Sequence, residues 1–409
     1  MKTIKQKKVE LVAPAGTLRK LRIALHYGAD AVYLSGKEFG LRKRAGNFTL
    51  DEISQGVSEA HAAGRKVYLT LNIFAHNQHI EPLQENCKSL KNIGLDAVIV
   101  SDPGAFSIVR KIMPDTKIHI STQANVTNSA SVSFWQTLGA DRVVLARELS
   151  LEEISEITRH TSIDVETFIH GAMCISYSGR CLLSSYLADR GANLGDCAHP
   201  CRWEYNVTEK KRTDEPLEII EEDDCTYIMS SRDLCMIEHI PELIESGISA
   251  LKIEGRIKTE HYVASVTRIY REALDKYYDN PNGYKTDPAW FEELSRTTRK
   301  GFTTGFFFGN PLDAGQVYGK HQSPTDQPFM GIVTDTERTD GLVEILSKNK
   351  MVSGMELTCM SQKRSGDRLI KILELRDDKG NVIEYSQPNQ IVLAKLSTQM
   401  SINEILCRR

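Results

Sequence analysis

The sequence predicts an α/β protein: a TIM-type (β/α)8 barrel with a cysteine-rich insertion after strand 7, followed by a small C-terminal β-barrel domain. From residue 9 to about 280, short β-rich runs alternate with amphipathic helical patterns. Several of these helices end at a glycine directly before the next apolar run, as in HYGADAVYL and TLGADRVVL. An open doubly wound sheet would also alternate in this way, but eight strand–helix units favour a closed barrel.

The predicted barrel strands share a short, apolar and often β-branched character. They are Glu10–Pro14, Ala31–Ser35, Lys66–Asn72, Ala97–Ser101, Lys117–Thr122, Arg142–Ala146, Asp164–His170 and Ala250–Glu254. Amphipathic helices are predicted between them, for example over Thr17–Tyr27, Leu50–Ala63, Ile80–Ile93 and Leu151–Thr158. Thr49 or Asp51 caps the second helix, and Ser150 with Glu153 forms a capping box.

The alternation of strands and helices is interrupted between the seventh and eighth strands. This stretch holds a cysteine-rich segment and then a charged run, Glu209–Asp224, which reads as a loop. A short extended piece, TYIMSSRDL, follows and is expected to end at a helix cap, Ser231 or Asp233. Helices are then predicted over Met236–Glu245 and His261–Tyr278.

After residue 280 the pattern changes again. One more helix is predicted over Phe291–Arg299, and from residue 329 apolar and polar residues alternate between turns. This alternation indicates a small antiparallel β-barrel or sandwich. We expect a catalytic domain over residues 1–310, a linker over 311–328 and a β-domain over 329–409.

Size and charge set broad limits. The 409 residues carry a formal net charge of −3, so the overall charge does not indicate a nucleic-acid partner. Local basic patches can still bind RNA. The apolar run after the basic first residues is too short for a signal peptide or a membrane span. We therefore expect a cytoplasmic protein without a membrane partner, whose cysteines stay reduced.

In a TIM barrel the active site forms where the strands end at their carboxyl side. The strongest polar pattern there is LKIEGR, which places Lys252, Glu254 and Arg256 on one face of the last strand. Together with Arg147, these residues are expected to bind a small anionic co-substrate, because guanidinium groups hold carboxylates and phosphates in a fork. Glu254 or His170, at the end of the seventh strand, is expected to handle protons.

Four of the nine cysteines lie just after the seventh strand, at Cys174, Cys181, Cys197 and Cys201. The numbers of residues between them are six, fifteen and three. Both zinc and iron–sulfur clusters accept four thiolates, so spacing alone leaves an iron–sulfur cluster, zinc or no metal open. Cys225 or Cys235 could replace Cys201 as the fourth ligand. Tyr177 and Trp203 beside the cysteines either pack around this site or stack on a base.

Four stretches together resemble peptidase family U32. They are ELVAPAG, GADAVY, ETFIHGAMCISYSGRCLLSSY and SALKIEGR. Residues 9–310 resemble the catalytic domain of the family and about 325–398 its C-terminal β-domain. The central block looks most like the tRNA-hydroxylating members of the family.

The resemblance implies O2-independent hydroxylation of the wobble uridine of tRNA to 5-hydroxyuridine, with prephenate as the hydroxyl source. It also implies a [4Fe–4S] cluster held by Cys174, Cys181, Cys197 and Cys201. An electron donor and a homo- or hetero-oligomer with a paralogue are further expectations. Other relatives act on an rRNA cytidine or a quinone precursor.

The family name also implies a collagenase-like peptidase, which is the alternative function. The sequence offers no metalloprotease motif and no clear pairing of a nucleophile with a base. The nearest approach is Cys174 with His170, which could imitate a Cys–His pair.

Overall fold

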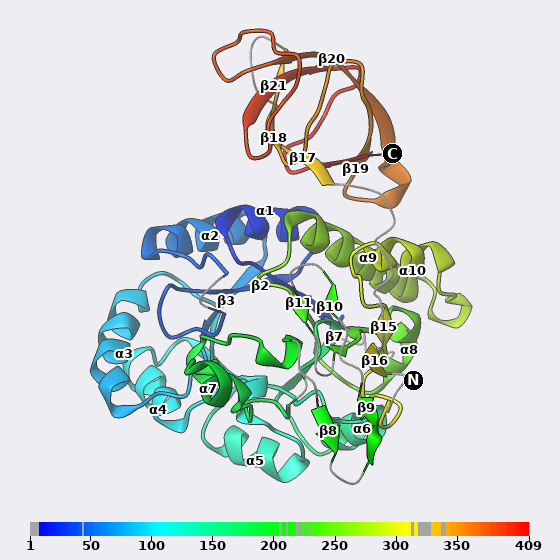
Figure 1. Cartoon of the computed structure of the whole chain (residues 1–409). Coiled ribbons are helices and arrows are strands. Elements are labelled where there is room, and N and C mark those ends of the chain that lie inside the picture. Colours follow the sequence, from blue (N-terminus) through cyan, green and yellow to red (C-terminus); the bar gives the residue numbers. More distant parts are fainter. Residues whose placement is uncertain are drawn as a thin grey trace.

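The computed structural model shows two closed barrels (Figure 1). It describes residues 8–42, 45–174, 176–203, 207–209, 212–217, 221–222, 225–226, 230–311, 315–317, 329–336 and 341–408. Among these residues, no helix has the length and the apolar character that crossing a bilayer requires.

The larger barrel is built of parallel strands that pair in chain order, and the last strand closes the ring by pairing with both the first and the seventh. The predicted TIM-type fold is therefore confirmed. Its eight strands are β1 (Glu10–Pro14), β2 (Ala31–Ser35), β3 (Lys66–Leu71), β4 (Ala97–Val100), β5 (Lys117–Ile120), β6 (Arg142–Val144), β7 (Asp164–Gly171) and β14 (Ala250–Ile253).

Helices surround this ring (Figure 1). They are α1 (Leu18–His26), α2 (Leu50–Ala62), α3 (Asn77–Leu90), α4 (Pro103–Ile112), α5 (Ser129–Thr137), α6 (Leu151–Arg159), α8 (Ile240–Glu245) and α9 (Glu260–Asp279). Their starts follow from capping side chains. Thr49 with Glu52, and Ser150 with Glu153, form reciprocal capping boxes at α2 and α6, which satisfy backbone N–H groups that have no partner within the helix.

The stretch between β7 and β14 departs from the sequence prediction in its helices and strands. A short helix, α7 (Leu183–Ala188), lies inside the cysteine-rich segment, where none was predicted. Described residues of the charged run expected to be a loop take part in strand pairs, namely β8 (Val207–Glu209) with β9 (Arg212–Leu217) and β10 (Glu221–Glu222) with β11 (Cys225–Thr226). The remainder of that run lies outside the described residues.

The expected helix cap at Ser231 or Asp233 is wrong, because both residues belong to strands. Ser231 lies in β12 (Ser230–Ser231), which pairs with β16 (Gln316–Val317). Asp233 lies in β13 (Asp233–Cys235), which pairs with β7 and with β15 (Phe302–Thr303). The helix predicted over Phe291–Arg299 is α10 (Pro288–Ser295), which starts earlier because Asp287 caps it and Pro288 suits its first position.

The second barrel is a closed antiparallel ring with the strand order β17-β18-β21-β20-β19-β22. Its strands are β17 (Phe329–Asp335), β18 (Val343–Ser347), β19 (Glu356–Met360), β20 (Arg368–Arg376), β21 (Ile391–Leu396) and β22 (Ile405–Arg408). This result confirms the predicted C-terminal β-barrel.

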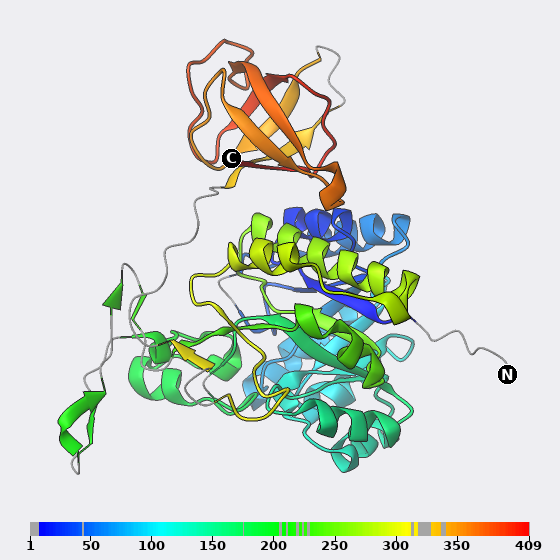
Figure 2. The same ribbon diagram turned by 90° about the vertical axis from the view of Figure 1, so that its right-hand side faces the viewer.

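The two barrels are joined by a buried contact beside α1 and α9 (Figure 2). Ile332 and Ile405 of the small barrel belong to the same hydrophobic cluster as Tyr27, whose hydroxyl donates to the Met360 carbonyl at 2.6 Å. Arg268 of α9, 3% exposed, reaches across this contact. It donates to Asp367 at 2.7 Å and to the Ser361 carbonyl at 3.1 Å, and it is also paired with Glu293 within 2.6 Å.

Replacing Arg268 should therefore destabilise the protein strongly. Arg268→Ala leaves two carboxylates without their buried partner, and removal of one member of such a network typically costs about 3–5 kcal/mol. Denaturant unfolding measures this loss. The control Lys88→Ala removes an exposed pair with Glu85 and should cost less than about 1 kcal/mol. An Arg268→Ala protein as stable as this control would contradict the proposed anchor.

Candidate active site

Two adjoining cavities open at the carboxyl ends of the barrel strands. The lower one, about 60 Å³, occupies the barrel mouth. The upper one, about 130 Å³, lies between the mouth and the cysteine-rich segment. Five residues line both cavities, which makes them parts of one site: Leu41, Arg42, Thr122, Gln123 and Arg147.

Lys252, Glu254 and Arg256 all line the lower cavity, as the sequence placed them on one face. The Nζ of Lys252 donates to Glu166 at 2.8 Å and lies 4.4 Å from the centre of the Tyr33 ring. Arg256 is 3% exposed and donates to the Leu41 carbonyl.

Glu254 lies at the centre of the cations in this cavity. Its carboxylate is 3.5 Å from Arg147 and 3.8 Å from Arg42. Burial works to raise the pKa of Glu254, but Arg42, Arg147, Arg256 and Lys252 outweigh it and hold the pKa below its ordinary value. Glu254 is therefore ionised near neutral pH and suits a base or a counter-ion rather than a proton donor.

The lower cavity has an excess of positive charge. Four cations line it, and the one carboxylate among its lining residues is Glu254. Because Lys252 is already neutralised by Glu166, the charge left over comes from the arginines. Arg147 is well placed to present it, since its guanidinium stacks 4.0 Å above the Phe168 ring and is tied to the Ala172 carbonyl at 2.8 Å. This arrangement suits a small anion.

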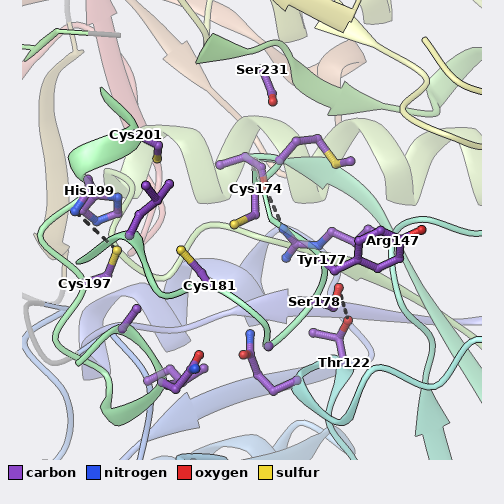
Figure 3. A pocket seen from close by; sticks show the side chains of 18 of the residues that line it. Thr122, Arg147, Cys174, Tyr177, Ser178, Cys181, Cys197, His199, Cys201 and Ser231 are labelled. Carbon is purple, nitrogen blue, oxygen red and sulfur yellow. Dashed lines mark hydrogen bonds between the residues drawn. The ribbon is translucent and has the colours of Figure 1, made fainter. Parts of the chain in front are cut away.

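The upper cavity brings the four cysteines of the insertion together. Cys174, Cys181, Cys197 and Cys201 all line it, and all four are free thiols. Figure 3 shows their sulfur atoms around a common space, with Arg147 close to Cys174. The backbone N–H of His199 donates to the sulfur of Cys197 at 3.3 Å.

Contacts with the barrel hold this segment in place. Gly171 ends β7 with a φ of +107°, and a Cβ there would lie 2.4 Å from the Glu254 carbonyl oxygen, so a side chain would push the insertion away from the mouth. Further along, the backbone N–H of Phe74 donates to the Asn193 carbonyl at 3.1 Å. Within the segment, the Ser184 hydroxyl accepts the N–H of Ala198 at 2.9 Å and so fixes α7 beside Cys197.

The alternative fourth ligand Cys235 lies elsewhere. Its thiol is 6% exposed, does not line the cavity, and is 3.9 Å from the Tyr270 hydroxyl in the core. Burial raises the pKa of Cys235 to about 12. The side chain of Cys225 lies outside the described part of the chain. Cys201 is thus the cysteine that the described structure brings to the other three.

His170 does not reach either cavity, in contrast to the expectation that it faces the mouth. A bulge in β7 explains the difference, since Phe168 pairs with Lys252 but His170 pairs with the next residue, Ile253. The extra residue turns His170 to the outer side of the barrel, where its ring packs against Tyr262, Tyr270 and Phe302. The Cys174–His170 pair considered for a peptidase is therefore not formed.

Several residues of the site were not singled out from the sequence. Arg42 comes from the loop after β2, Ser178 and His199 from the cysteine-rich segment, and Tyr33 from the inner face of β2. Only Arg42 carried a usable signal, because it begins the basic run RKR beside a strand end. The other three look like ordinary loop or core residues in the sequence.

The fold and the site define a TIM barrel whose mouth combines a cationic cavity with a four-cysteine cavity. Residues 16–316 match the model of peptidase family U32, and residues 325–406 match that of the U32 C-terminal domain. The chain belongs to peptidase family U32.

Three relatives extend this result. The chain is 40% identical to the tRNA hydroxylation protein P1 of Bacillus subtilis, covering 98% of this chain and 94% of the relative. It is 39% identical to the tRNA hydroxylation protein P of Escherichia coli, covering 87% and 86%. It is 33% identical to a 23S rRNA 5-hydroxycytidine synthase of Escherichia coli, covering 76% of this chain and 47% of that protein.

The burial of His170 predicts a pH-dependent stability. Burial lowers its pKa to about 3, from an ordinary value of 6.5, so the folded state resists protonation. Below pH 6.5, His170 binds a proton in the unfolded state but stays neutral in the folded state. The free energy of unfolding is therefore highest above pH 6.5 and falls by about 1.4 kcal/mol per pH unit as the pH drops towards 3. Urea unfolding at pH 7 and pH 5 should show the wild type losing about 2 kcal/mol more than His170→Phe. If the wild type and His170→Phe lose the same free energy of unfolding between pH 7 and pH 5, His170 is not the cause of the pH dependence.

Proposed function

We propose that the chain hydroxylates the wobble uridine of tRNA to 5-hydroxyuridine without O2, with prephenate as the hydroxyl source and a [4Fe–4S] cluster as cofactor. The near full-length similarity to two tRNA hydroxylation proteins supports the substrate. One observation carries the proposal: the cationic cavity in the barrel mouth adjoins the cavity lined by four thiols. The two cavities share five lining residues.

The four thiols that line the upper cavity are the ligand set that an iron–sulfur cluster takes. In the part of the chain that the structure describes, no three Cys, His, Asp or Glu side chains are grouped closely enough to hold one metal ion. A zinc site would need its thiolates only about 3.8 Å apart, given Zn–S bonds of about 2.3 Å. A four-iron cluster separates its ligands more widely, and N–H bonds to sulfur, such as that from His199 to Cys197, are typical of such sites.

The cluster would be held by Cys174, Cys181, Cys197 and Cys201, and when bound it would supply electron transfer next to the mouth. Arg147 and Arg256 would bind the carboxylates of the co-substrate below it, with Lys252 behind them. Glu254, kept ionised by these cations, would accept a proton from the reacting groups.

RNA would approach over the cysteine-rich segment, where large side chains are exposed. Tyr177 is 60% exposed and Tyr186 of α7 is 82% exposed. Aromatic rings in this position suit stacking on unpaired bases, as in a tRNA loop. Arg42, which borders both cavities, adds positive charge near the same opening.

Nucleoside analysis of tRNA tests this function directly. Deleting the gene, together with any paralogue, should abolish 5-hydroxyuridine and its derivatives, and the wild-type gene should restore them. Arg147→Ala should restore less than about a tenth, because mouth residues that bind the co-substrate contribute factors of this size. The matched control Arg159→Ala changes an exposed arginine of α6 and should restore the wild-type level. Unchanged tRNA in the deletion strain would refute the proposal.

Anaerobic purification tests the cofactor separately. The protein should be brown and hold about four iron atoms and four sulfides per chain, as a [4Fe–4S] cluster requires. Cys197→Ser should retain less than half of this iron. Cys87→Ala, which alters a buried cysteine of α3 that lines neither cavity, should retain nearly all of it. A colourless protein with one zinc ion per chain would rule out the cluster.

A further inference from the structure

The turn between the first two cysteines is fixed to the barrel by a carboxylate. Glu148, in the connection after β6, accepts the backbone N–H of Ser178 at 3.0 Å. The Ser178 hydroxyl lies 3.4 and 3.3 Å from the two oxygens of the same carboxylate. Ser178 is only 8% exposed, so these bonds face little competition from water.

A second strand end reinforces the contact. Thr122, just after β5, donates its hydroxyl to the Leu145 carbonyl at 3.0 Å and lies 3.4 Å from the Ser178 hydroxyl (Figure 3). The turn is therefore bonded to the ends of two neighbouring barrel strands. These same strand ends form the rim of the barrel mouth.

Gly179 makes this close approach possible. A Cβ on Gly179 would lie 2.1 Å from the backbone oxygen of Gln123, and its φ of +75° is one that other residues rarely adopt. The turn thus lies flush against Gln123, which borders both cavities. Any larger residue would lift it away from the mouth.

We propose that Glu148 is a positioning residue, which sets where Cys174 and Cys181 lie relative to the barrel mouth. Ser178 stands four residues after Cys174 and three before Cys181, in a stretch whose described residues form no helix or strand. With no regular structure to orient it, the stretch takes its position from this anchor. The inference rests on the proposed function only in taking an iron–sulfur cluster as the group that the thiols bind. The position of the thiols does not depend on that function.

Four variants separate this role from general damage to the fold. Glu148→Ala removes the acceptor, whereas Glu148→Gln keeps a side-chain oxygen for the Ser178 N–H and should rescue the effect. Gly179→Ala pushes the turn away from the backbone of Gln123 and should have the same effect as Glu148→Ala. The control Glu153→Ala breaks the capping box of α6 in the same connection but does not touch the turn.

The first measurement is made on iron-free, fully reduced protein. The rates of alkylation of Cys174 and Cys181 by iodoacetamide are followed by peptide mass spectrometry, with Cys197 and Cys201 as internal references. Glu148→Ala and Gly179→Ala should change the rate at Cys181 at least threefold relative to these references. Glu148→Gln and Glu153→Ala should stay within a factor of 1.5 of the wild type.

The second measurement is made on protein purified without oxygen. The rate at which a chelator removes iron should rise at least fivefold in Glu148→Ala, and the electron paramagnetic resonance signal of the reduced protein should change its g values. If the wild type holds no iron, the cluster proposal fails, and the alkylation rates alone decide the role of Glu148. Wild-type alkylation rates in Glu148→Ala would overturn the inference, whatever the iron content.

Discussion

The structure depends on a charge enclosed within the larger barrel. Glu166 of β7 is fully buried and is paired with Arg142 of β6 at 2.9 Å and with Lys252 of β14 at 2.8 Å. A buried carboxylate is tolerated only when cations neutralise it, so these three strands must meet in one register. Arg142 continues the network to Glu10 of β1, at 2.8 Å. The strands that close the ring are thus joined by charges as well as by the backbone ladder.

This network also determines what the mouth can do. Because Lys252 is bound to Glu166, its charge is already balanced, and the arginines that line the lower cavity supply the charge available to a ligand. Arg42 extends that charge upwards. Burial works to lower the pKa of Arg42, but Glu254 and the thiols of Cys197 and Cys174 outweigh it.

The sequence predicted the barrel well because each strand is a short apolar run and several of the runs follow a glycine, and this signal is local. β1 and β2 match their predicted bounds, and the others end within two residues of them. The direction of His170 could not be predicted, because it depends on a bulge against β14, eighty residues away in the chain. Arg42 belongs to the site through loop geometry, which no periodic pattern encodes.

The spacing of the cysteines can now be explained physically. In the interval between Cys174 and Cys181, Ser178 bonds to Glu148 at the barrel before the chain returns to Cys181. The fifteen residues after Cys181 contain α7, whose Ser184 bonds the chain next to Cys197. The three residues before Cys201 include His199, whose left-handed backbone turns the chain back towards the cavity. The irregular spacing, which resembles no zinc knuckle, therefore follows from fitting a loop-rich segment onto the rim of a barrel.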